Sequence, residues 1–434
     1  MSKPLGRTLY TAAFSLATPL VAAYLLHRSR RQPAYREHWR ERWAAWSEPA
    51  PAAAPTLWLH AVSLGETRAA QPLVSALRAR WPGHRLLVTQ MTPTGREAAR
   101  ALYPDAVVEY LPYDYPWAAR RFLARWRPSL GILMETELWP NFLAAAREAR
   151  VPMALVNARM SERSAAGYAR FGAFAREAFA SLACVAAQTP ADAQRLRALG
   201  AASPIVTGNL KFDAQPDPAL LARGRDWRAG FSRSRVWVAA STREGEEALL
   251  LHAAERLRDP STLLVLVPRH PQRFDEVARL AQAQGWRVAR RSQTERPASD
   301  VDLWLGDSMG ELPAYYAAAD LAFVGGSLVP LGGQNLIEAC ACGLPVLVGE
   351  HTFNFAQATE QAIAAGAARR VSDADALVHA VRAWLSDDAA RTAAATAARA
   401  FTAAHRGATT RTLTLLEPLV RSSEPIVPPA GVVR

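Results

Sequence analysis

Lysine and cysteine are both scarce in this sequence of 434 residues. Lysine occurs only at Lys3 and Lys211, although lysine and arginine together number 51. The three cysteines, Cys184, Cys340 and Cys342, include no C-x-x-C pair and show no His/Cys metal spacing. The sequence therefore argues against a disulfide-stapled secreted domain and against a cysteine-based zinc site, and it predicts a reducing compartment.

The formal net charge is +12 and the pI is about 10.2. This balance predicts anionic partners, such as nucleic acid, a membrane surface or phosphorylated substrates. A coding bias toward arginine and alanine would produce the same composition, so the charge is weak evidence for nucleic acid. Lys211 is different, because its compact ammonium can do what a planar guanidinium cannot. Composition alone leaves open whether Lys211 is functional or survives by chance.

An uncharged, mostly apolar run of 18 residues covers positions 9–26, with basic residues on both sides. It is close to the roughly 20 residues that span a bilayer, and no small-x-small cleavage site follows it, which disfavours a signal peptide. The larger positive charge after the run predicts that the rest of the chain is cytoplasmic. Pro19 and the short length leave open a helix that embeds in only one leaflet. We therefore expect residues 1–30 to be a membrane anchor, followed by interfacial aromatic residues at Tyr35, Trp39, Trp43 and Trp46.

Short apolar runs then alternate with amphipathic helical stretches, which predicts two parallel, doubly wound α/β domains. The runs lie at 57–62, 86–89, 107–111, 130–134, 153–156, 184–187 and 205–207 in the first half, and at 236–240, 263–267, 301–305, 321–324 and 345–348 in the second. The expected boundaries are a first domain at 50–212, a polar linker at 213–232, a second domain at 233–404, a C-terminal helix at 405–421 and a loose tail at 422–434. Folds of this kind bind ligands at the carboxyl ends of their strands, and we expect the two halves to face a cleft.

Polar residues follow several strands of the first half, where the carboxyl ends of parallel strands meet at one edge. Glu66 follows the first strand and can act as a general base if its pKa is raised, but a glutamate that only stabilises the next helix would occupy the same position. Glu135 and Glu137 follow the fourth strand, and we expect one of them to face the ligand. Helix capping explains Glu137 more readily than Glu135. Lys211 follows the seventh strand and so belongs to the same rim.

Strand-end turns of the second half carry basic residues and glycines. Residues 240–246 form a possible phosphate cradle. Pro268 fixes the backbone beside Arg269 and His270, which offer donors to a base or a phosphate. Residues 306–311 can line a nucleotide pocket. A solvated basic loop is the alternative for the turn at Arg269, and it fits the flanking prolines less well.

The fourth such turn lies within residues 321–350, where an apolar strand, a glycine-rich turn and a short helix follow one another. The glycines let the backbone approach a ligand closely, and the helix start offers unpaired N–H groups to an anion. Glu338 is placed for the hydroxyl groups of a ribose. An ordinary chain reversal would also use glycines, but four turns on consecutive strand ends favour a nucleotide site.

These motifs, in this order, resemble those of the 3-deoxy-D-manno-octulosonic acid (Kdo) transferases of Gram-negative bacteria. The matching pieces are SLGE at 63–66, MTPTG at 91–95, METELWPN at 134–141, NARMS at 157–161, GNLKFD at 208–213, VPRHP at 267–271, GDSMGE at 306–311 and FVGGSL at 323–328. They span essentially the whole chain. The resemblance implies a GT-B glycosyltransferase with two Rossmann-like domains, acceptor half first and donor half second, and no metal or other cofactor.

The resemblance also implies the substrates and the roles of single residues. The donor is CMP-Kdo, and the acceptor is the phosphorylated lipid A precursor at the anionic cytoplasmic surface of the inner membrane; nucleic acid is not expected. Glu66 is implied as the proton acceptor, and Glu135 and Lys211 as groups that stabilise the transition state. The implied CMP contacts are Pro268, Arg269, Met309, Gly310, Glu311, Asn335, Leu336, Ile337 and Glu338.

One departure and several alternatives remain. Leu336 stands where family members often have proline, which puts the geometry of the helix start in question. Lys211 can meet either the Kdo carboxylate or the leaving phosphate, and the number of Kdo units transferred is not encoded in these motifs. The rival interpretations are a membrane-associated GT-B transferase that uses a UDP-sugar, and a non-catalytic, membrane-anchored nucleotide-binding protein.

Overall fold

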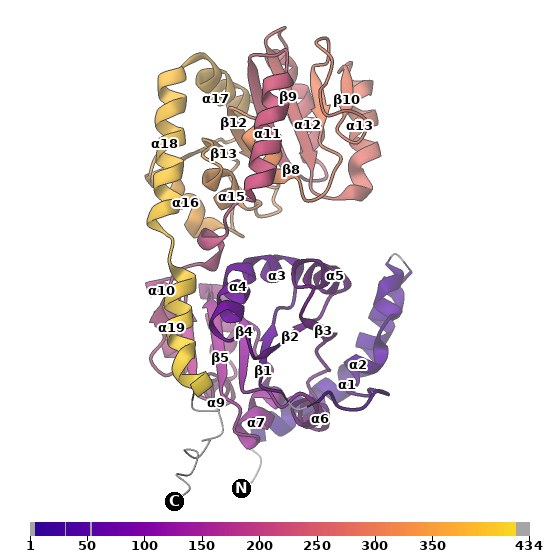
Figure 1. Ribbon diagram of the computed structural model, residues 1–434, viewed down its shortest axis with the longest axis vertical. Coiled ribbons are helices and arrows are strands. Elements are labelled where there is room, and N and C mark those ends of the chain that lie inside the picture. The colour runs from indigo at the N-terminus through magenta and orange to yellow at the C-terminus, as the bar shows by residue number, and fades with distance from the viewer. Residues whose placement is uncertain (1–4, 31, 53, 422–434) are drawn as a thin grey trace, which may run out of the picture. The chain divides into compact units, whose positions relative to one another are not determined.

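The computed structural model describes residues 5–30, 32–52 and 54–421, so the predicted loose tail at 422–434 lies outside the described residues (Figure 1). The chain forms two compact units. The first consists of Met1–Ala214 together with Arg406–Arg434, and the second is Gln215–His405. The chain therefore passes from the first unit to the second and returns.

The first unit is built on a seven-stranded parallel sheet with the order β3-β2-β1-β4-β5-β6-β7. Its strands are β1 (Thr56–His60), β2 (Arg85–Gln90), β3 (Val107–Tyr110), β4 (Leu130–Met134), β5 (Met153–Ala158), β6 (Cys184–Ala187) and β7 (Ile205–Val206). Every residue of β1, β4 and β5 is buried, as expected for central strands covered by helices on both faces. The prediction of a parallel, doubly wound sheet is confirmed for this unit.

The second unit has its own seven-stranded parallel sheet, ordered β10-β11-β9-β8-β12-β13-β14. Its strands are β8 (Arg235–Thr242), β9 (Thr262–Pro268), β10 (Val288–Arg290), β11 (Leu303–Leu305), β12 (Leu321–Val324), β13 (Val346–Val348) and β14 (Ala368–Arg370). The two edge strands, β10 and β14, were not predicted. Each has only three residues and carries arginine, so neither shows the apolar run by which the other strands were recognised.

Helices flank both sheets. Those of the first unit are α1 (Leu5–Arg28), α2 (Trp39–Arg42), α3 (Leu64–Ala69), α4 (Gln71–Arg80), α5 (Pro93–Leu102), α6 (Pro116–Trp126), α7 (Pro140–Glu148), α8 (Glu162–Ala169), α9 (Gly172–Ala180), α10 (Pro190–Ala198) and α19 (Ala408–Arg421), with the 3₁₀ turns η1 (Pro33–Arg36) and η2 (Leu210–Asp213). Those of the second unit are α11 (Pro218–Gly230), α12 (Glu246–Ala254), α13 (Phe274–Ala283), α14 (Leu312–Ala317), α15 (Leu336–Ala341), α16 (Ala356–Ala364), α17 (Ala374–Ser386) and α18 (Asp388–Ala404), with η3 (Glu255–Leu257) and η4 (Pro271–Arg273).

The segment predicted as a linker, 213–232, is mostly the helix α11 of the second unit. Its Trp227 is buried, and the indole packs edge-on against Trp304 of β11 with ring centroids 5.0 Å apart. Tyr315 of α14 lies 5.2 Å from the same indole. The linker prediction is therefore wrong for most of this segment, because a polar helix with one aromatic anchor gives little apolar periodicity.

The C-terminal helix α19 belongs to the first unit, where it lies beside α4 (Figure 1). Leu416 and Val420 are buried in the core of that unit, and the Arg80 guanidinium donates to Glu417 at 2.6 Å. The sequence predicted the helix itself but not its place in the fold.

The aromatic residues after α1 pack against the first unit. Tyr35 is buried, and the Arg28 guanidinium lies 4.8 Å from its ring centre. The Trp43 ring stacks on Tyr115 at 6.0 Å, and Trp46 donates its indole N–H to Glu109 at 3.1 Å. Three of the four aromatic side chains thus pack within the first unit, and their place at a membrane interface stays a prediction.

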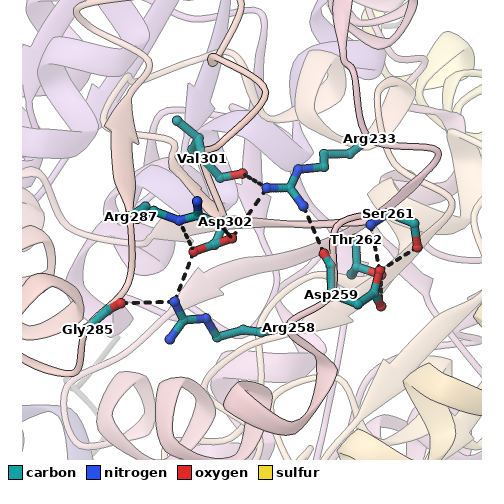
Figure 2. A network of polar contacts seen from close by, with 9 residues as sticks. All are labelled: Arg233, Arg258, Asp259, Ser261, Thr262, Gly285, Arg287, Val301 and Asp302. Atoms are coloured by element: carbon teal, nitrogen blue, oxygen red, sulfur yellow. Dashed lines mark hydrogen bonds and ion pairs between the residues drawn. The ribbon is translucent and has the colours of Figure 1, made fainter.

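A cluster of arginines surrounds Asp302 at the amino ends of the strands in the second unit, shown in Figure 2. The Asp302 carboxylate, 7% exposed, accepts hydrogen bonds from Arg287 at 2.6 and 2.8 Å, from Arg258 at 3.0 Å and from Arg233 at 3.4 Å. Ligand-binding turns of such sheets follow the opposite, carboxyl ends of the strands. We therefore infer that this cluster stabilises the fold of the second unit and does not bind a ligand.

We expect Asp302→Asn to lower the free energy of unfolding of the second unit by about 2 kcal/mol, which corresponds to a fall in Tm of about 4–8 °C. Burial alone would raise the pKa of Asp302, but the bonds from Arg287 and Arg258 outweigh it and hold the pKa below its ordinary value. The stabilisation is therefore complete above that ordinary value and is lost as the pH falls through the lowered one. Thermal unfolding at pH 7 and at pH 3 should show a smaller difference between wild type and variant at pH 3 than at pH 7; an equal difference at both would contradict this account.

Candidate active site

Glu66 lies at the start of α3, directly beyond the carboxyl end of β1. Its carboxylate accepts the Val62 N–H at 2.8 Å and the Ser63 hydroxyl at 3.0 Å, while Ser63 caps the helix by accepting the Glu66 N–H. Burial, with smaller contributions from Glu135 and Glu137, raises the pKa of Glu66 to about 7. The helix-capping alternative is thus realised, and the same carboxylate also has the pKa that suits a general base near neutral pH.

Glu135 and Lys211 form an ion pair on the same rim. The Lys211 Nζ lies 3.4 Å from the Glu135 Oε1, and both side chains are 20% exposed. Glu137 is also partly buried, and its pKa is raised by burial and then by the charge of Glu135. The structure therefore brings together the three residues that the sequence singled out in this half.

The backbone is strained where these strands end. Glu135 has φ +59°, Asn157 at the end of β5 has φ +51°, and Ser241 at the end of β8 has φ +58°. Side chains other than glycine rarely adopt this left-handed conformation, and it clusters at functional sites. The strain therefore supports a functional role for the carboxyl edges of both sheets.

Lys211 is positioned by residues to which the sequence assigned no role. Asn157 accepts the Leu210 N–H at 3.0 Å, and Asn209 accepts the N–H of Lys211 itself at 3.0 Å. The Asp213 carboxylate accepts the N–H groups of Gly407 at 2.7 Å and Thr409 at 2.5 Å, which ties η2 to the start of α19. The motifs NARMS and GNLKFD contain these residues, but their partners are too distant in sequence for a motif to reveal.

In the second unit, Glu246 organises the glycine-rich turn after β12. Its buried carboxylate accepts four backbone N–H groups, from Gly326 at 2.6 Å, Leu328 at 3.0 Å, Ser327 at 3.1 Å and Arg243 at 3.2 Å. An internal anion thus occupies a concave set of amides of the kind that binds phosphate elsewhere. The carboxylate joins the turns after β8 and β12, which are neighbours in the sheet.

Glu246→Gln should distort both turns, because its amide N–H₂ would face backbone N–H donors. We expect a loss of about 1–3 kcal/mol in unfolding free energy, together with weaker binding of CMP. Differential scanning calorimetry and titration with CMP measure the two effects. The neighbouring exposed Glu244→Gln is the matched control, and equal behaviour of the two variants would contradict the role given to Glu246.

Positive groups gather at the turns after β8 and β9. The Arg269 N–H donates to the Thr242 carbonyl at 3.0 Å, which holds the two turns side by side. The pKa of His270 is lowered by partial burial and by the nearby charges of Arg243, Arg269 and Arg273. Several cations at one strand-end edge suit a phosphate group. Arg243 lies in the turn at 240–246 that the sequence analysis noted, but no role was predicted for this residue.

The predicted nucleotide contacts at the turn after β11 differ in character. Met309 is half exposed and Gly310 has φ +83°, so this turn offers a side chain and a backbone edge to solvent. The Glu311 carboxylate is paired with Arg223 at 2.7 Å and with Arg291 at 2.9 Å. The Glu311 side chain is thus engaged within the protein.

The start of α15 keeps its geometry despite leucine at position 336. Asn335 caps the helix, since its side-chain oxygen accepts the Ile337 N–H at 3.2 Å. Leu336 and Ile337 are buried in the core, so any ligand contact of theirs has to come from the backbone. Glu338 is partly exposed on the first turn. The doubt about the helix entry is therefore removed, because proline and leucine both suit the first helical position.

Comparison with known proteins decides the family. Residues 37–214 match the model of the 3-deoxy-D-manno-octulosonic-acid transferase (kdotransferase) family, and residues 247–401 match that of the glycosyl transferases group 1. The 3-deoxy-D-manno-octulosonic acid transferase of Bordetella pertussis is 50% identical over 428 residues, which cover 95% of this chain and 99% of the relative. The chain belongs to the Kdo transferase family. The family's enzyme from Haemophilus influenzae is 37% identical, with 95% of this chain and 98% of the relative covered.

The fold of this Kdo transferase family member is shared more widely. The UDP-N-acetylglucosamine 2-epimerase of Neisseria meningitidis superposes with a TM-score of 0.58, at 15% identity, over 84% of this chain and 100% of the neighbour. Such a low identity supports the fold alone. With two parallel-sheet α/β domains, the chain is a GT-B glycosyltransferase, as the sequence predicted.

Proposed function

We propose that the chain transfers Kdo from CMP-Kdo to a hydroxyl group of the lipid A precursor (tetraacyldisaccharide bisphosphate, lipid IVA) in lipopolysaccharide core biosynthesis, with inversion at the anomeric carbon. The observation that carries the proposal is the Glu66 carboxylate, held beyond β1 with a pKa raised to about 7. A base of this kind suits the deprotonation of a sugar hydroxyl at neutral pH. Membership of the Kdo transferase family supports the choice of donor.

In the proposed reaction Glu66 takes the proton of the acceptor hydroxyl, and the oxygen attacks the anomeric carbon of Kdo. The bond from that carbon to the phosphate oxygen breaks, and CMP leaves with the bonding electron pair. The sugar passes through an oxocarbenium-like state, so negative charge grows on the departing phosphate. Lys211, oriented by Glu135, would stabilise this charge or hold the Kdo carboxylate.

The donor half would hold CMP at the turns of the second sheet. Arg269 and Arg243 are suited to the phosphate, and Pro268 fixes the strand end beside them. The further proposed contacts with CMP are Met309, Gly310, Glu311, Asn335, Leu336, Ile337 and Glu338. We propose no metal ion or other cofactor, because these cationic side chains can supply the charge that the leaving phosphate needs.

We also propose that the enzyme works at the cytoplasmic surface of the inner membrane. The helix α1 is long and apolar enough to cross a bilayer, which by length and composition alone is weak evidence for an anchor. The net charge of +12 suits a surface of anionic lipids and a phosphorylated acceptor.

The test is a product analysis with the purified full-length protein in detergent. Lipid IVA and CMP-Kdo should give a product heavier by one or more Kdo residues, and the same reaction should proceed after treatment with EDTA. UDP-sugars should give no product. Transfer from a UDP-sugar, or the absence of any product, would overturn the proposal, and the mass also counts the Kdo units.

A further inference from the structure

The helix α1 has two different faces. One face, with Tyr10, Thr11, Phe14 and Thr18, is partly buried against the first unit. The other face is apolar and turned away from the protein, with Leu16 81% and Leu20 74% exposed and with Leu9, Tyr24 and Leu26 exposed beside them. One face of such a helix contacts the protein, and the other is free to contact an apolar partner.

Polar contacts fix the inner face of α1 to the start of α7. The buried Asp114 carboxylate accepts the N–H groups of Phe142 at 2.9 Å and Asn141 at 3.1 Å, and it also receives the Tyr10 hydroxyl. The Asn141 side-chain amide donates to the Thr11 hydroxyl oxygen at 3.0 Å and to the Asp114 carbonyl at 2.6 Å. Removing α1 would leave these buried groups short of partners, which is costly.

Aromatic packing holds α1 along its length. The Phe14 ring meets Tyr115 edge-on at 5.3 Å, and Tyr10 lies 5.7 Å from Phe174 of α9. Gly6 permits this approach, because a Cβ there would come within 2.9 Å of the Phe174 side chain. The Thr18 hydroxyl is hydrogen-bonded to Tyr115. The contacts therefore run from the first turn of the helix to its middle.

Two further exposed apolar residues of the first unit lie in or beside helices that pack near α1. Trp117 of α6 is 44% exposed and stacks on Tyr115, the residue that packs against Phe14. Phe171, 65% exposed, lies at the start of α9, which also contacts α1. Several large apolar side chains exposed on and near one helix suit an apolar partner.

Basic residues border this surface. A cavity of about 250 Å³ runs beside α1, and its lining includes Arg7 of α1, Arg120 of α6 and Glu148 of α7. Glu148 pairs with Arg120 at 2.9 Å, so Arg7 carries the unneutralised positive charge of this lining. Arg28 and Arg30 are exposed at the other end of the helix. Arginines around an apolar face complement an anionic headgroup layer.

We propose that α1 lies in the plane of one leaflet, its inner face docked on the first unit and its outer face, with Trp117 and Phe171, immersed in an anionic lipid bilayer. The proposal rests on the membrane localisation proposed above. At 24 residues the helix is also long enough to span, at about 36 Å. Spanning would separate Tyr10 and Thr11 from Asp114 and Asn141, so the two arrangements exclude each other.

The two arrangements place the N-terminus on opposite sides of the membrane. An epitope tag before Met1 should resist protease added to intact spheroplasts and should be cleaved only after the inner membrane is permeabilised. Cleavage in intact spheroplasts would show a spanning helix and overturn the proposal. Transfer activity, measured on the same tagged protein, separates this failure from a failure of the proposed function.

A second experiment tests the lipid-facing residues by flotation with vesicles that contain phosphatidylglycerol. The double variant Leu16→Asp/Leu20→Asp is expected to reduce vesicle binding by at least tenfold, while Leu249→Asp, which changes an exposed leucine of α12, should bind like wild type. Circular dichroism checks that both proteins are folded. Unchanged binding of the double variant would overturn the outer face as the lipid contact.

Discussion

Glu66→Gln is expected to reduce the rate of Kdo transfer by about 10²–10⁴-fold, the usual contribution of a positioned general base. Glutamine keeps the shape of the side chain and can still accept a hydrogen bond from the Val62 N–H, but it cannot take the acceptor's proton. Binding of CMP should be unchanged, because the proposed nucleotide contacts belong to the second unit. Steady-state kinetics and titration with CMP measure the two quantities, and near wild-type turnover would remove Glu66 from the role of base.

The same carboxyl group predicts the pH dependence of the wild-type enzyme. Burial raises the pKa of Glu66 to about 7, and only the deprotonated form can act as a base. The rate should therefore fall about tenfold per pH unit below pH 7 and level off above it. A rate that stays flat between pH 5 and pH 8 would show that another group limits the reaction.

The free energy of unfolding should change with pH in the opposite direction to the rate. The folded state binds the Glu66 proton more tightly than the unfolded chain, so raising the pH from the ordinary value of 4.5 to about 7 costs stability. A neutral glutamine does not carry this cost. We therefore expect Glu66→Gln to have a Tm at pH 8 no lower than that of wild type, which distinguishes lost chemistry from lost folding.

Lys211→Met is expected to lower kcat by about 10²–10³-fold, since it removes a preorganised cation from the developing negative charge. Lys211→Arg should restore little, because a planar guanidinium cannot take the place of the ammonium 3.4 Å from Glu135. Arg197→Met, which removes an exposed positive charge from α10 of the same unit, is the matched control. Full activity of Lys211→Arg would mean that charge alone matters at this position.

The sequence predicted the strands that are apolar and central, and with them the rim on which Glu66, Glu135 and Lys211 meet. It did so because the carboxyl ends of parallel strands share one edge, whatever the side-chain contacts are. The edge strands β10 and β14 were missed, since three-residue strands that carry arginine have no apolar pattern. The helix α11 was missed for a related reason, its burial being concentrated in Trp227.

The residues that position the site through hydrogen bonds to its backbone could not be predicted in the same way. In the sequence, Glu246 looks like any acidic residue in the first turn of a helix. Only the structure shows that its carboxylate accepts hydrogen bonds from backbone N–H groups of a turn 80 residues away. Asn157 and Asp213 reach partners 53 and 194 residues distant. Such contacts are set by tertiary packing, for which neither local propensity nor periodicity gives a signal.

The hydrogen bonds from the Gly407 and Thr409 N–H groups to the Asp213 carboxylate decide how the two units can be expressed separately. The second unit is an insertion, 215–405, placed between two pieces of the first. A gene truncated after residue 405 would lose α19 and the N–H groups that bind Asp213, which lies two residues from Lys211. Glu66, Glu135 and Lys211 would all still be encoded. The first unit would have to be made by splicing residue 214 to residue 406, or by circular permutation, whereas the second can be cut out as one uninterrupted fragment.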